Sequence, residues 1–322
     1  DIEDYEEAFG SSETFEGTVA WINSVELTGL TPGTEYYVII PHETKEERFK
    51  FRTAPVNPEE VVFITASDFH LSGTDEEGRE RRRIVMKAMA DEEPDFLVIA
   101  GDLWYQDSNP NSTVEESVDG FFDDLHEALI TSDNRRIPIV PAEGNHDNIQ
   151  DVGSSSEQNV NKENAPFYYN RFKLPGEEAY YVLQYGPDLT LISLNSGHSA
   201  PIEGEQVLWL KQTLEQYQSS EWIIPFHHVG YYPSVRNFNV NHKIKNWINL
   251  YEQYGVDLVV NGHDHAYKRT YPIRNNKIDY EDGIVYIGDG GSVTRLRETD
   301  LSRWYIFEGA LGYNFFKLVM SQ

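Results

Sequence analysis

The chain has 322 residues, of which 39% are hydrophobic and 13% aromatic, a composition typical of a globular protein rather than a disordered one. Its formal net charge of −28 at pH 7 opposes binding to nucleic-acid backbone and to anionic lipid, so neither is an expected partner. The absence of cysteine excludes disulfides and thiolate ligands, so any metal must be held by His, Asp, Glu, Asn or Tyr. No apolar run approaches the roughly 18 residues that span a bilayer.

Residues 1–57 read as a small β segment followed by a linker. Short β runs include VAWI and the alternating RFKFRT, and a turn is predicted at Pro32 and Gly33. The stretch LTGLTPGTEYYV is similar to the end of a fibronectin type III module, but only about 40 residues match where a complete sandwich has roughly 100. We therefore expect a partial fibronectin-like segment over 1–57 and a catalytic domain over 58–322.

After residue 60 apolar strands alternate with amphipathic helices, which is the pattern of an α/β layered domain. Strands are predicted at 61–66, 96–100, 137–142, 180–185, 189–194, 222–226, 257–260, 284–287 and 315–319. Helices are predicted at 76–91, 114–130, 204–217 and 243–254. The segment 151–164, rich in Asn, Ser and Glu, is predicted to be a long loop.

Five of these strands end in short turns of Gly, Asp, Asn and His. The turns are SDFH (67–70), GDLWY (101–105), GNHD (144–147), HH (227–228) and GHDH (262–265). In open α/β sheets ligands bind at the carboxyl ends of the strands, so the five turns are expected to meet in one crevice. A single Asp or Asn after a strand is usually a turn residue or a helix N-cap. Five such turns together favour a shared site.

The turns supply enough donors for two metal ions. The candidate ligands are Asp68, Asp102, Asn145, His227, His263 and His265, together with His70 or Tyr105. One ion seldom uses so many N and O groups, whereas two ions sharing a carboxylate would. The mixed donors suit iron, zinc or manganese rather than calcium or magnesium. Two ions about 3.5–4 Å apart can clamp a phosphoryl oxygen and activate a bridging water, which predicts hydrolysis of a phosphate ester.

The ordered set D-F-H, G-D-L-W-Y, G-N-H-D, I-P-F-H and G-H-D-H resembles the calcineurin-like metallophosphoesterase superfamily. Within it, GDLWY, GHDHAYKR and IGDGGS resemble purple acid phosphatases, which also carry a fibronectin-like N-terminal domain. The resemblance implies a four-layer αββα sandwich with a dimetal centre, iron paired with zinc, manganese or a second iron. It also implies a phosphate monoesterase in which metal-bound hydroxide attacks phosphorus.

Carried over residue by residue, the resemblance assigns a role to each ligand. Asp102 would bridge the two metals. The remaining assignments are Asp68 and His265 to the first metal, and Asn145, His227 and His263 to the second. The apolar Ile224, three residues before His227, selects that histidine over its neighbour, and His228 is then expected to face the substrate.

Next to the ligand Asn145, His146 is expected to contact the phosphate or to protonate the leaving oxygen. Its pairing with Asp147 would orient the imidazole and keep it cationic. Asn145 is also expected to contact substrate.

The first metal site departs from the purple acid phosphatase pattern. Those proteins have glycine two residues after the first aspartate and use the tyrosine on iron, whereas the wider superfamily has histidine there and no such tyrosine. This chain has both His70 and Tyr105. Either His70 binds and Tyr105 turns aside, or Tyr105 binds and His70 lies behind it. Because Asp-x-His is a complete ligand pair, His70 is favoured.

Two other functions fit the sequence less well. A phosphodiesterase or nucleotidase would use the same dimetal centre, and a metal-dependent binding or adhesion protein would explain the acidic surface and the β segment. No ligand is missing, which favours an enzyme. The chain starts at Asp1 without an apolar leader, as after removal of a targeting segment, and we expect a secreted, periplasmic or cell-surface protein.

Two further groups of residues are expected to lie on the protein surface rather than in the site. The run RERRR (79–83) either supplies positive potential for a phosphate or forms a solvated helix face, and its acidic neighbours favour the solvated face. His198 and His242, both in predicted loops, are expected to be surface residues.

Overall fold

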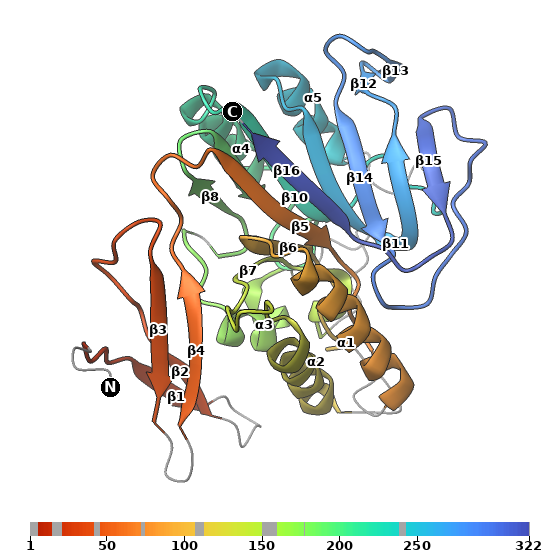
Figure 1. Ribbon diagram of the computed structural model, residues 1–322. Helices are drawn as coiled ribbons and strands as arrows, with labels where there is room; N and C mark the ends of the chain where they lie inside the picture. Colours follow the sequence, from red (N-terminus) through yellow and green to blue (C-terminus); the bar gives the residue numbers. More distant parts are fainter. Residues whose placement is uncertain are drawn as a thin grey trace.

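The computed structural model describes residues 6–14, 21–41, 46–71, 75–106, 113–149, 160–176, 178–237 and 243–321. Two β-sheets lie face to face in the main body, and helices cover the outer side of each (Figure 1). The predicted αββα fold is therefore confirmed.

The N-terminal part forms two small antiparallel pairs. β1 (Ser11–Thr14) pairs with β2 (Trp21–Ser24), and β3 (Glu35–Ile40) pairs with β4 (Glu47–Arg52). Lys50 of β4 connects this part to the main body, since its ammonium lies 2.8 Å from the Asp133 carboxylate. The boundary after residue 57 stays a prediction.

The first sheet has the strand order β16-β5-β6-β7. Its members are β5 (Glu60–Ala66), β6 (Phe96–Ala100), β7 (Ile139–Ala142) and β16 (Phe316–Ser321). β5, β6 and β7 run parallel, and β16 pairs antiparallel with β5. The carboxyl ends of three strands therefore lie at one edge of this sheet.

The second sheet has the order β14-β11-β10-β9-β8, and β15 pairs with β11. Its members are β8 (Tyr181–Tyr185), β9 (Leu189–Ser193), β10 (Trp222–Val229), β11 (Leu258–Thr270), β14 (Val285–Gly290) and β15 (Ile306–Ala310). Within β11 the early residues match β14 in ascending order, but Lys268 and Arg269 match Gly288 and Ile287 in descending order. The chain thus turns back between Asn261 and Ala266, as predicted for GHDH.

Helices complete the outer layers. They are α1 (Glu76–Asp91), α2 (Val114–Ala128), α3 (Pro166–Arg171), α4 (Glu205–Gln216) and α5 (Lys245–Tyr254). Two 3₁₀ helices, η1 (Asn145–Asp147) and η2 (Lys162–Asn164), and the short strands β12 (Ile273–Arg274) and β13 (Lys277–Ile278) lie in connections. Of the predicted loop 151–164, residues 151–159 lie outside the described residues.

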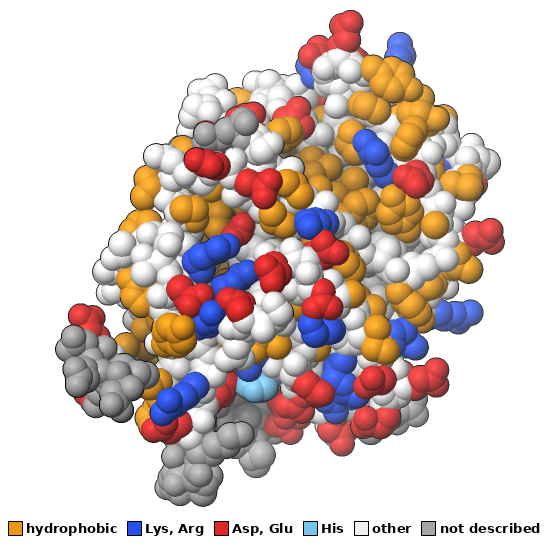
Figure 2. Space-filling view, in the orientation of Figure 1, with side chains coloured by type: hydrophobic (Ala, Val, Ile, Leu, Met, Phe, Trp, Pro, Cys, Tyr) orange, Lys and Arg blue, Asp and Glu red, His pale blue; other side chains and the backbone are white. Residues whose placement is uncertain are grey.

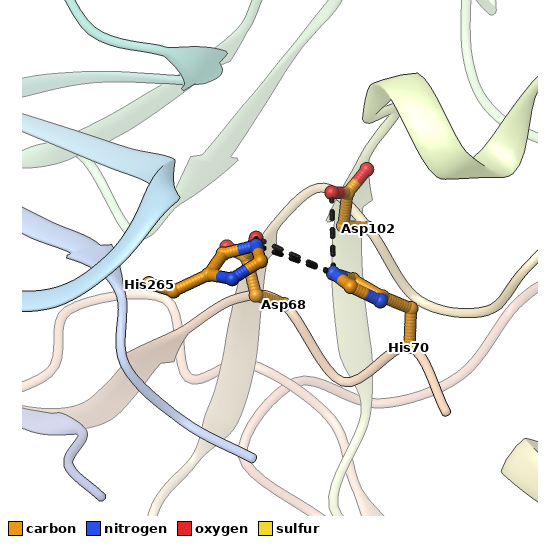
Figure 3. A group of neighbouring side chains, drawn as sticks. All are labelled: Asp68, His70, Asp102 and His265. Atoms are coloured by element: carbon orange, nitrogen blue, oxygen red, sulfur yellow. Dashed lines mark hydrogen bonds and ion pairs between the residues drawn. The ribbon is translucent and has the colours of Figure 1, made fainter. Parts of the chain in front are cut away.

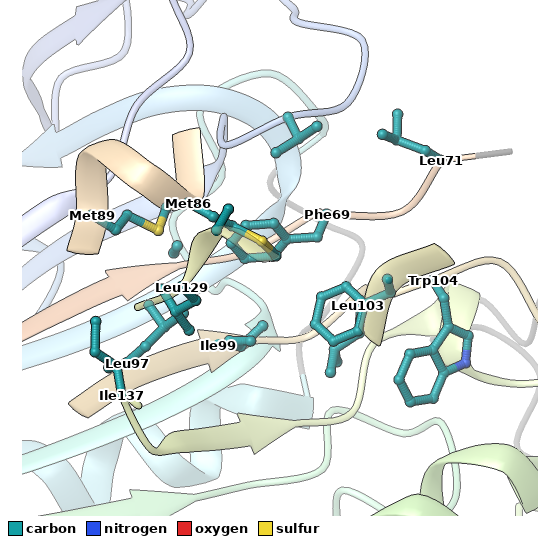
Figure 4. Packing of buried hydrophobic residues seen from close by; sticks show 14 of the residues in the cluster. Phe69, Leu71, Met86, Met89, Leu97, Ile99, Leu103, Trp104, Leu129 and Ile137 are labelled. Carbon is teal, nitrogen blue, oxygen red and sulfur yellow. The ribbon is translucent and has the colours of Figure 1, made fainter. Parts of the chain in front are cut away.

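Three hydrophobic clusters define the layers. One joins Met86 and Met89 of α1 to Leu97 and Ile99 of β6 (Figure 4). A second packs α4 and α5 on the outer face of the second sheet, and the third lies between the two sheets. Burial of these apolar surfaces contributes roughly 25 cal/mol per Å², which makes this packing the main source of cohesion.

The surface carries both signs of charge. On the face drawn in Figure 2, Lys and Arg side chains are interspersed with Asp and Glu. In the described part of the chain no helix has both the length and the apolar composition to cross a membrane.

Candidate metal centre

The first two ligand turns are fixed to each other by backbone hydrogen bonds. Asp68 follows β5 and Asp102 follows β6, and the N–H groups of Phe69 and His70 donate to the Asp102 carbonyl at 2.8 and 3.1 Å. Phe69 and Leu103, the residues after the two aspartates, are fully buried in the core beneath α1 and α2 (Figure 4). The apolar neighbours therefore anchor the polar turns.

Four of the predicted ligands have left-handed backbone. The φ angles are 60° at Asp68, 58° at Asp102, 82° at His263 and 59° at His265. Residues other than glycine seldom adopt this conformation, which costs of order 1–3 kcal/mol each and persists only where the surroundings enforce it. Such strain is concentrated at functional sites, so its occurrence at four residues of one crevice supports a site here.

A buried carboxylate holds the third turn against the second. Asp147 accepts hydrogen bonds from the N–H groups of Asp102 (2.9 Å), Leu103 (2.9 Å), Trp104 (3.3 Å) and Gly144 (2.8 Å). Gly144 must be small, because a Cβ there would lie 2.2 Å from Asp102 Oδ1. These four bonds fix Asp147 against the turn of Asp102, and its predicted pairing with the His146 imidazole stays a prediction.

The first group of candidate ligands consists of Asp68, His70, Asp102 and His265, all buried (Figure 3). His265 Nε2 lies 3.1 Å from Asp68 Oδ1 and 3.4 Å from His70 Nε2. His70 Nε2 is also 3.6 Å from Asp102 Oδ2. Two imidazoles and two carboxylates thus direct nitrogen and oxygen atoms at one point.

The second group consists of Asp102, His228 and His263. His228 Nε2 lies 3.0 Å from Asp102 Oδ2 and 3.2 Å from His263 Nδ1. It is also 3.1 Å from Asn145 Oδ1, which adds the predicted amide ligand to this group. Asp102 belongs to both groups and therefore occupies the position of a shared ligand.

The donor set fits a pair of cations. Among the buried polar atoms that the structure describes, Asp68 Oδ1 and Asp102 Oδ2 accept no hydrogen bond. Buried oxygens without a donor are costly and call for a ligand. The Nδ1 atoms of His265 and His228 lie 3.1 and 2.9 Å from the carbonyls of Arg295 and Ala100, respectively. A carbonyl can only accept, so each Nδ1 is the donor, and each Nε2, once deprotonated, would offer its lone pair to a metal.

Burial and charge act in opposite directions on the pKa values of these groups. Burial lowers the pKa of His70 to about 4 and that of His263 well below its usual range. Burial also lowers the pKa of His228, but the carboxylates of Asp102 and Asp68 outweigh it and raise the value to about 9. Burial raises the pKa of Asp102, yet His228 and His146 bring it well below its usual range. The site thus favours ionised carboxylates.

The expectation that His227 is the ligand and His228 faces substrate is corrected by the geometry. His227 Nδ1 donates to the Val229 carbonyl at 2.9 Å, and its ring packs on Trp247 of α5, outside the sheet. His228, one residue later, points to the opposite face of β10, toward Asp102. Successive residues of a strand alternate between its faces, so a shift of one residue exchanges ligand and core.

His146 and Tyr105 lie at the edge of the first group. The His146 N–H donates to Asp102 Oδ1 at 2.8 Å, and its half-buried ring is centred 4.4 Å from the ring of His70. The Tyr105 ring stands edge-on to His70 and His146, with centroids 4.5 and 4.8 Å away. The turns thus bring His70 and Tyr105 together.

Sequence reasoning missed a buried network behind η1. The Glu143 carboxylate accepts hydrogen bonds from Tyr169, Asn195 and Ser199. Burial raises the pKa of Glu143 to about 7. His198 belongs to the same region and is fully buried, its ring centred 5.7 Å from that of His228, so its expected surface position is wrong. His242 lies outside the described residues.

Known proteins share this sequence pattern and this fold. Purple acid phosphatase 15 of Arabidopsis thaliana is 26% identical over 307 residues, which cover 84% of this chain but 54% of that protein. The structure of purple acid phosphatase PPD1 from yellow lupin (Lupinus luteus) seeds superposes with a TM-score of 0.70 at 18% identity, covering 93% of this chain and 57% of that one. A structure of PhoD also gives 0.70, at 14% identity, with 94% and 72% covered.

The family model described as calcineurin-like phosphoesterase matches residues 61–267, which contain every predicted ligand from Asp68 to His265. This match spans well over half of the chain and coincides with the two buried groups of Asp and His side chains. The chain therefore belongs to the calcineurin-like phosphoesterase family, resembles purple acid phosphatases and carries a dimetal-type site.

Proposed function

We propose that this protein hydrolyses phosphate monoesters with two metal ions held by the two buried groups. One observation carries the proposal: Asp102 belongs to both groups, and its buried Oδ2, which accepts no hydrogen bond, lies between His70 and His228. When bound, a metal pair supplies Lewis acidity and lowers the pKa of a water shared between the ions.

The ligand roles follow from the distances. Asp68, His70 and His265 would hold the first ion, and Asn145, His228 and His263 the second. Asp102 would bridge them. Iron paired with zinc, manganese or a second iron suits these imidazole, carboxylate and amide donors.

His146 is proposed to contact the phosphate or to protonate the leaving oxygen. Its backbone is fixed by the bond to Asp102, and its imidazole lies beside the first group rather than in the core. Asp147, engaged by four backbone N–H groups, would set the position of this turn.

Tyr105 gives a spectroscopic test of the metal. If its hydroxyl binds ferric iron, the loaded protein has a visible absorption band, and Tyr105→Phe removes it. We expect His70 to complete the first site, so the spectrum of metal-replete protein should be the same in wild type and variant. Loss of a band in the variant would move Tyr105 into the ligand set.

The diesterase alternative would use the same dimetal centre, so it needs a direct comparison of substrates. The discriminating experiment compares turnover of p-nitrophenyl phosphate with that of bis-p-nitrophenyl phosphate, using protein purified without chelators and analysed for metal. We expect transition metal in the protein and preference for the monoester. His263→Ala serves as the control for contaminating activity and should lose turnover of both.

Two results would contradict the proposed monoesterase. Preference for the bis-ester would favour the diesterase. Protein without transition metal, and without activity after addition of iron, zinc or manganese, would contradict the enzyme and favour a binding protein. A location outside the cytoplasm remains a prediction alongside the activity.

A further inference from the structure

An anionic substrate faces an unfavourable long-range field in a chain with a net charge of −28. Bound metal ions would supply positive charge for the scissile phosphate, and a further anionic group needs positive charge beside them. Three of the four arginines in the run RERRR do not supply it, because Arg79, Arg82 and Arg83 all bond to the buried carboxylate of Asp124, at 2.9, 2.6 and 2.8 Å. Another group of arginines lies beside the GHDH turn.

Arg236, Arg295 and Arg297 are connected to that turn by hydrogen bonds. The Arg236 N–H donates to Asp264 Oδ2 at 3.2 Å, and its guanidinium donates to the His263 carbonyl at 3.5 Å. The Arg295 carbonyl accepts from His265 Nδ1 at 3.1 Å, and the Arg297 N–H donates to the His265 carbonyl at 2.9 Å. The guanidinium of Arg236 and the backbones of Arg295 and Arg297 are thus each one hydrogen bond away from a candidate metal ligand.

The loop that carries Arg236 is held in place. The guanidinium of Arg303 donates to the carbonyls of Pro233 (2.6 Å) and Val235 (2.8 Å), and Asp300 pairs with the same guanidinium at 3.2 Å. Asp264, almost fully buried, accepts from the Val235 N–H at 2.6 Å. The position of Arg236 is therefore set by the fold.

The three guanidinium groups leave an excess of positive charge. The side chain of Arg236 is 40% exposed and lies 3.4 Å from the Asp264 carboxylate. Arg295 is exposed and Arg297 is half-buried. The guanidinium of Arg236 reaches the carbonyl of His263, and the backbone of Arg297 is bonded to the carbonyl of His265, two residues further along the same turn. Among the residues that the structure describes, Arg295 and Arg297 make no side-chain hydrogen bond or ion pair.

We propose that Arg236, Arg295 and Arg297 form an anion subsite that binds a second phosphate group of the substrate. Guanidinium groups bind phosphate through paired, charge-assisted hydrogen bonds, and arginines held around one turn beside the metal ligands are suited to such a ligand. The preferred substrates are then phosphate esters that carry another phosphate a few bonds from the scissile one. This inference rests on the proposed hydrolase function.

The test compares two substrates of matched chemistry, 3-hydroxypropyl phosphate and propane-1,3-diyl bisphosphate. The metal-loaded wild type should have at least about tenfold higher kcat/KM for the bisphosphate, beyond the factor of two from its two equivalent phosphates. In the double variant Arg236→Gln/Arg297→Gln this preference should fall to about twofold. It should also weaken at high ionic strength in the wild type.

Arg48→Gln is the control for the loss of a positive charge. Its guanidinium is exposed and pairs with Glu46 at 2.7 Å in the N-terminal β segment. This variant should keep the wild-type preference. An unchanged preference in the double variant, or an equal loss in the control, would overturn the subsite.

Calorimetric titration of metal-loaded protein with pyrophosphate gives a readout without turnover. Affinity should be about tenfold weaker in the double variant than in the wild type, and the loss for inorganic phosphate should be smaller. Equal pyrophosphate affinity in the two proteins would contradict the subsite. Protein that binds pyrophosphate through these arginines but hydrolyses neither ester would retain the subsite and contradict the proposed function.

Discussion

Charged side chains are buried together at two places, the metal centre and the contact between α1 and α2. At the contact, both oxygens of the buried Asp124 accept hydrogen bonds from arginines. The guanidinium groups are those of Arg79, Arg82 and Arg83. At the metal centre, Asp68 Oδ1 and Asp102 Oδ2 accept none.

The difference separates a structural cluster from a binding site. Carboxylate oxygens that have all their partners within the protein hold helices together, whereas buried oxygens without donors require a ligand from outside. The two places are also connected, because Arg82 donates to the carbonyl of Phe69, next to His70, at 3.2 Å. The cluster of Asp124 and its arginines therefore supports the turn that carries the first metal ligands.

The largest effect is expected at the carboxylate shared by the two ligand groups. Asp102→Asn removes the charge between His70 and His228 and replaces an acceptor oxygen by an amide. We expect loss of bound metal and at least a thousandfold lower kcat/KM, about 4 kcal/mol in activation free energy. Metal analysis and p-nitrophenyl phosphate turnover measure this. A variant with wild-type metal content and activity would contradict a shared ligand.

A substitution in the cluster of Asp124 and its arginines, between α1 and α2, should change the stability of the protein rather than its metal content. Asp124→Asn leaves the buried arginines without their counter-charge and should lower the free energy of unfolding by about 3 kcal/mol. The neighbouring Asp123→Asn is the matched control, since that side chain is 73% exposed and should cost less than about 0.5 kcal/mol. Urea denaturation of the two variants measures this difference in the free energy of unfolding. Equal stabilities would remove the structural role of the cluster.

The smallest difference is expected between adjacent histidines. His228→Ala and His227→Ala each remove a fully buried imidazole and should destabilise the protein by a similar 1–2 kcal/mol or so. Only His228→Ala should reduce the metal content, from two ions per chain toward one. If the metal content falls in His227→Ala instead, His227 is the ligand, and the alternation of side chains along β10 does not identify the metal-binding histidine.

Much of the site could be predicted because its ligands follow hydrophobic strands. The turns after β5, β6 and β7, and the turn within β11, lie where the apolar runs end. The prediction of His227 as the ligand was wrong because it relied on the spacing in the sequence from Ile224. The strand itself holds the answer: Ile224 and Phe226 lie between the sheets, so by alternation His228 does too.

Other features depend on contacts distant in sequence. The sequence of the run RERRR does not indicate that its arginines pair with Asp124, some forty residues away. The charge of the paired arginines is neutralised by this carboxylate and is not available to substrate. The partners of Asp147 are backbone N–H groups of another turn, which a sequence pattern does not reveal. His198 is buried because its loop folds under η1, where the Asn148 side chain donates to its carbonyl at 2.9 Å.

The metal centre draws its ligands from both sheets. Asp68, His70 and Asp102 follow strands of the first sheet, whereas His228, His263 and His265 belong to strands of the second. Ions bound there would cross-link the two halves of the sandwich, in a chain that has no cysteine to form a covalent bridge. The free energy of metal binding at such a site adds to the free energy of folding. The stability of the contact between the two sheets would therefore depend on the concentration of available metal.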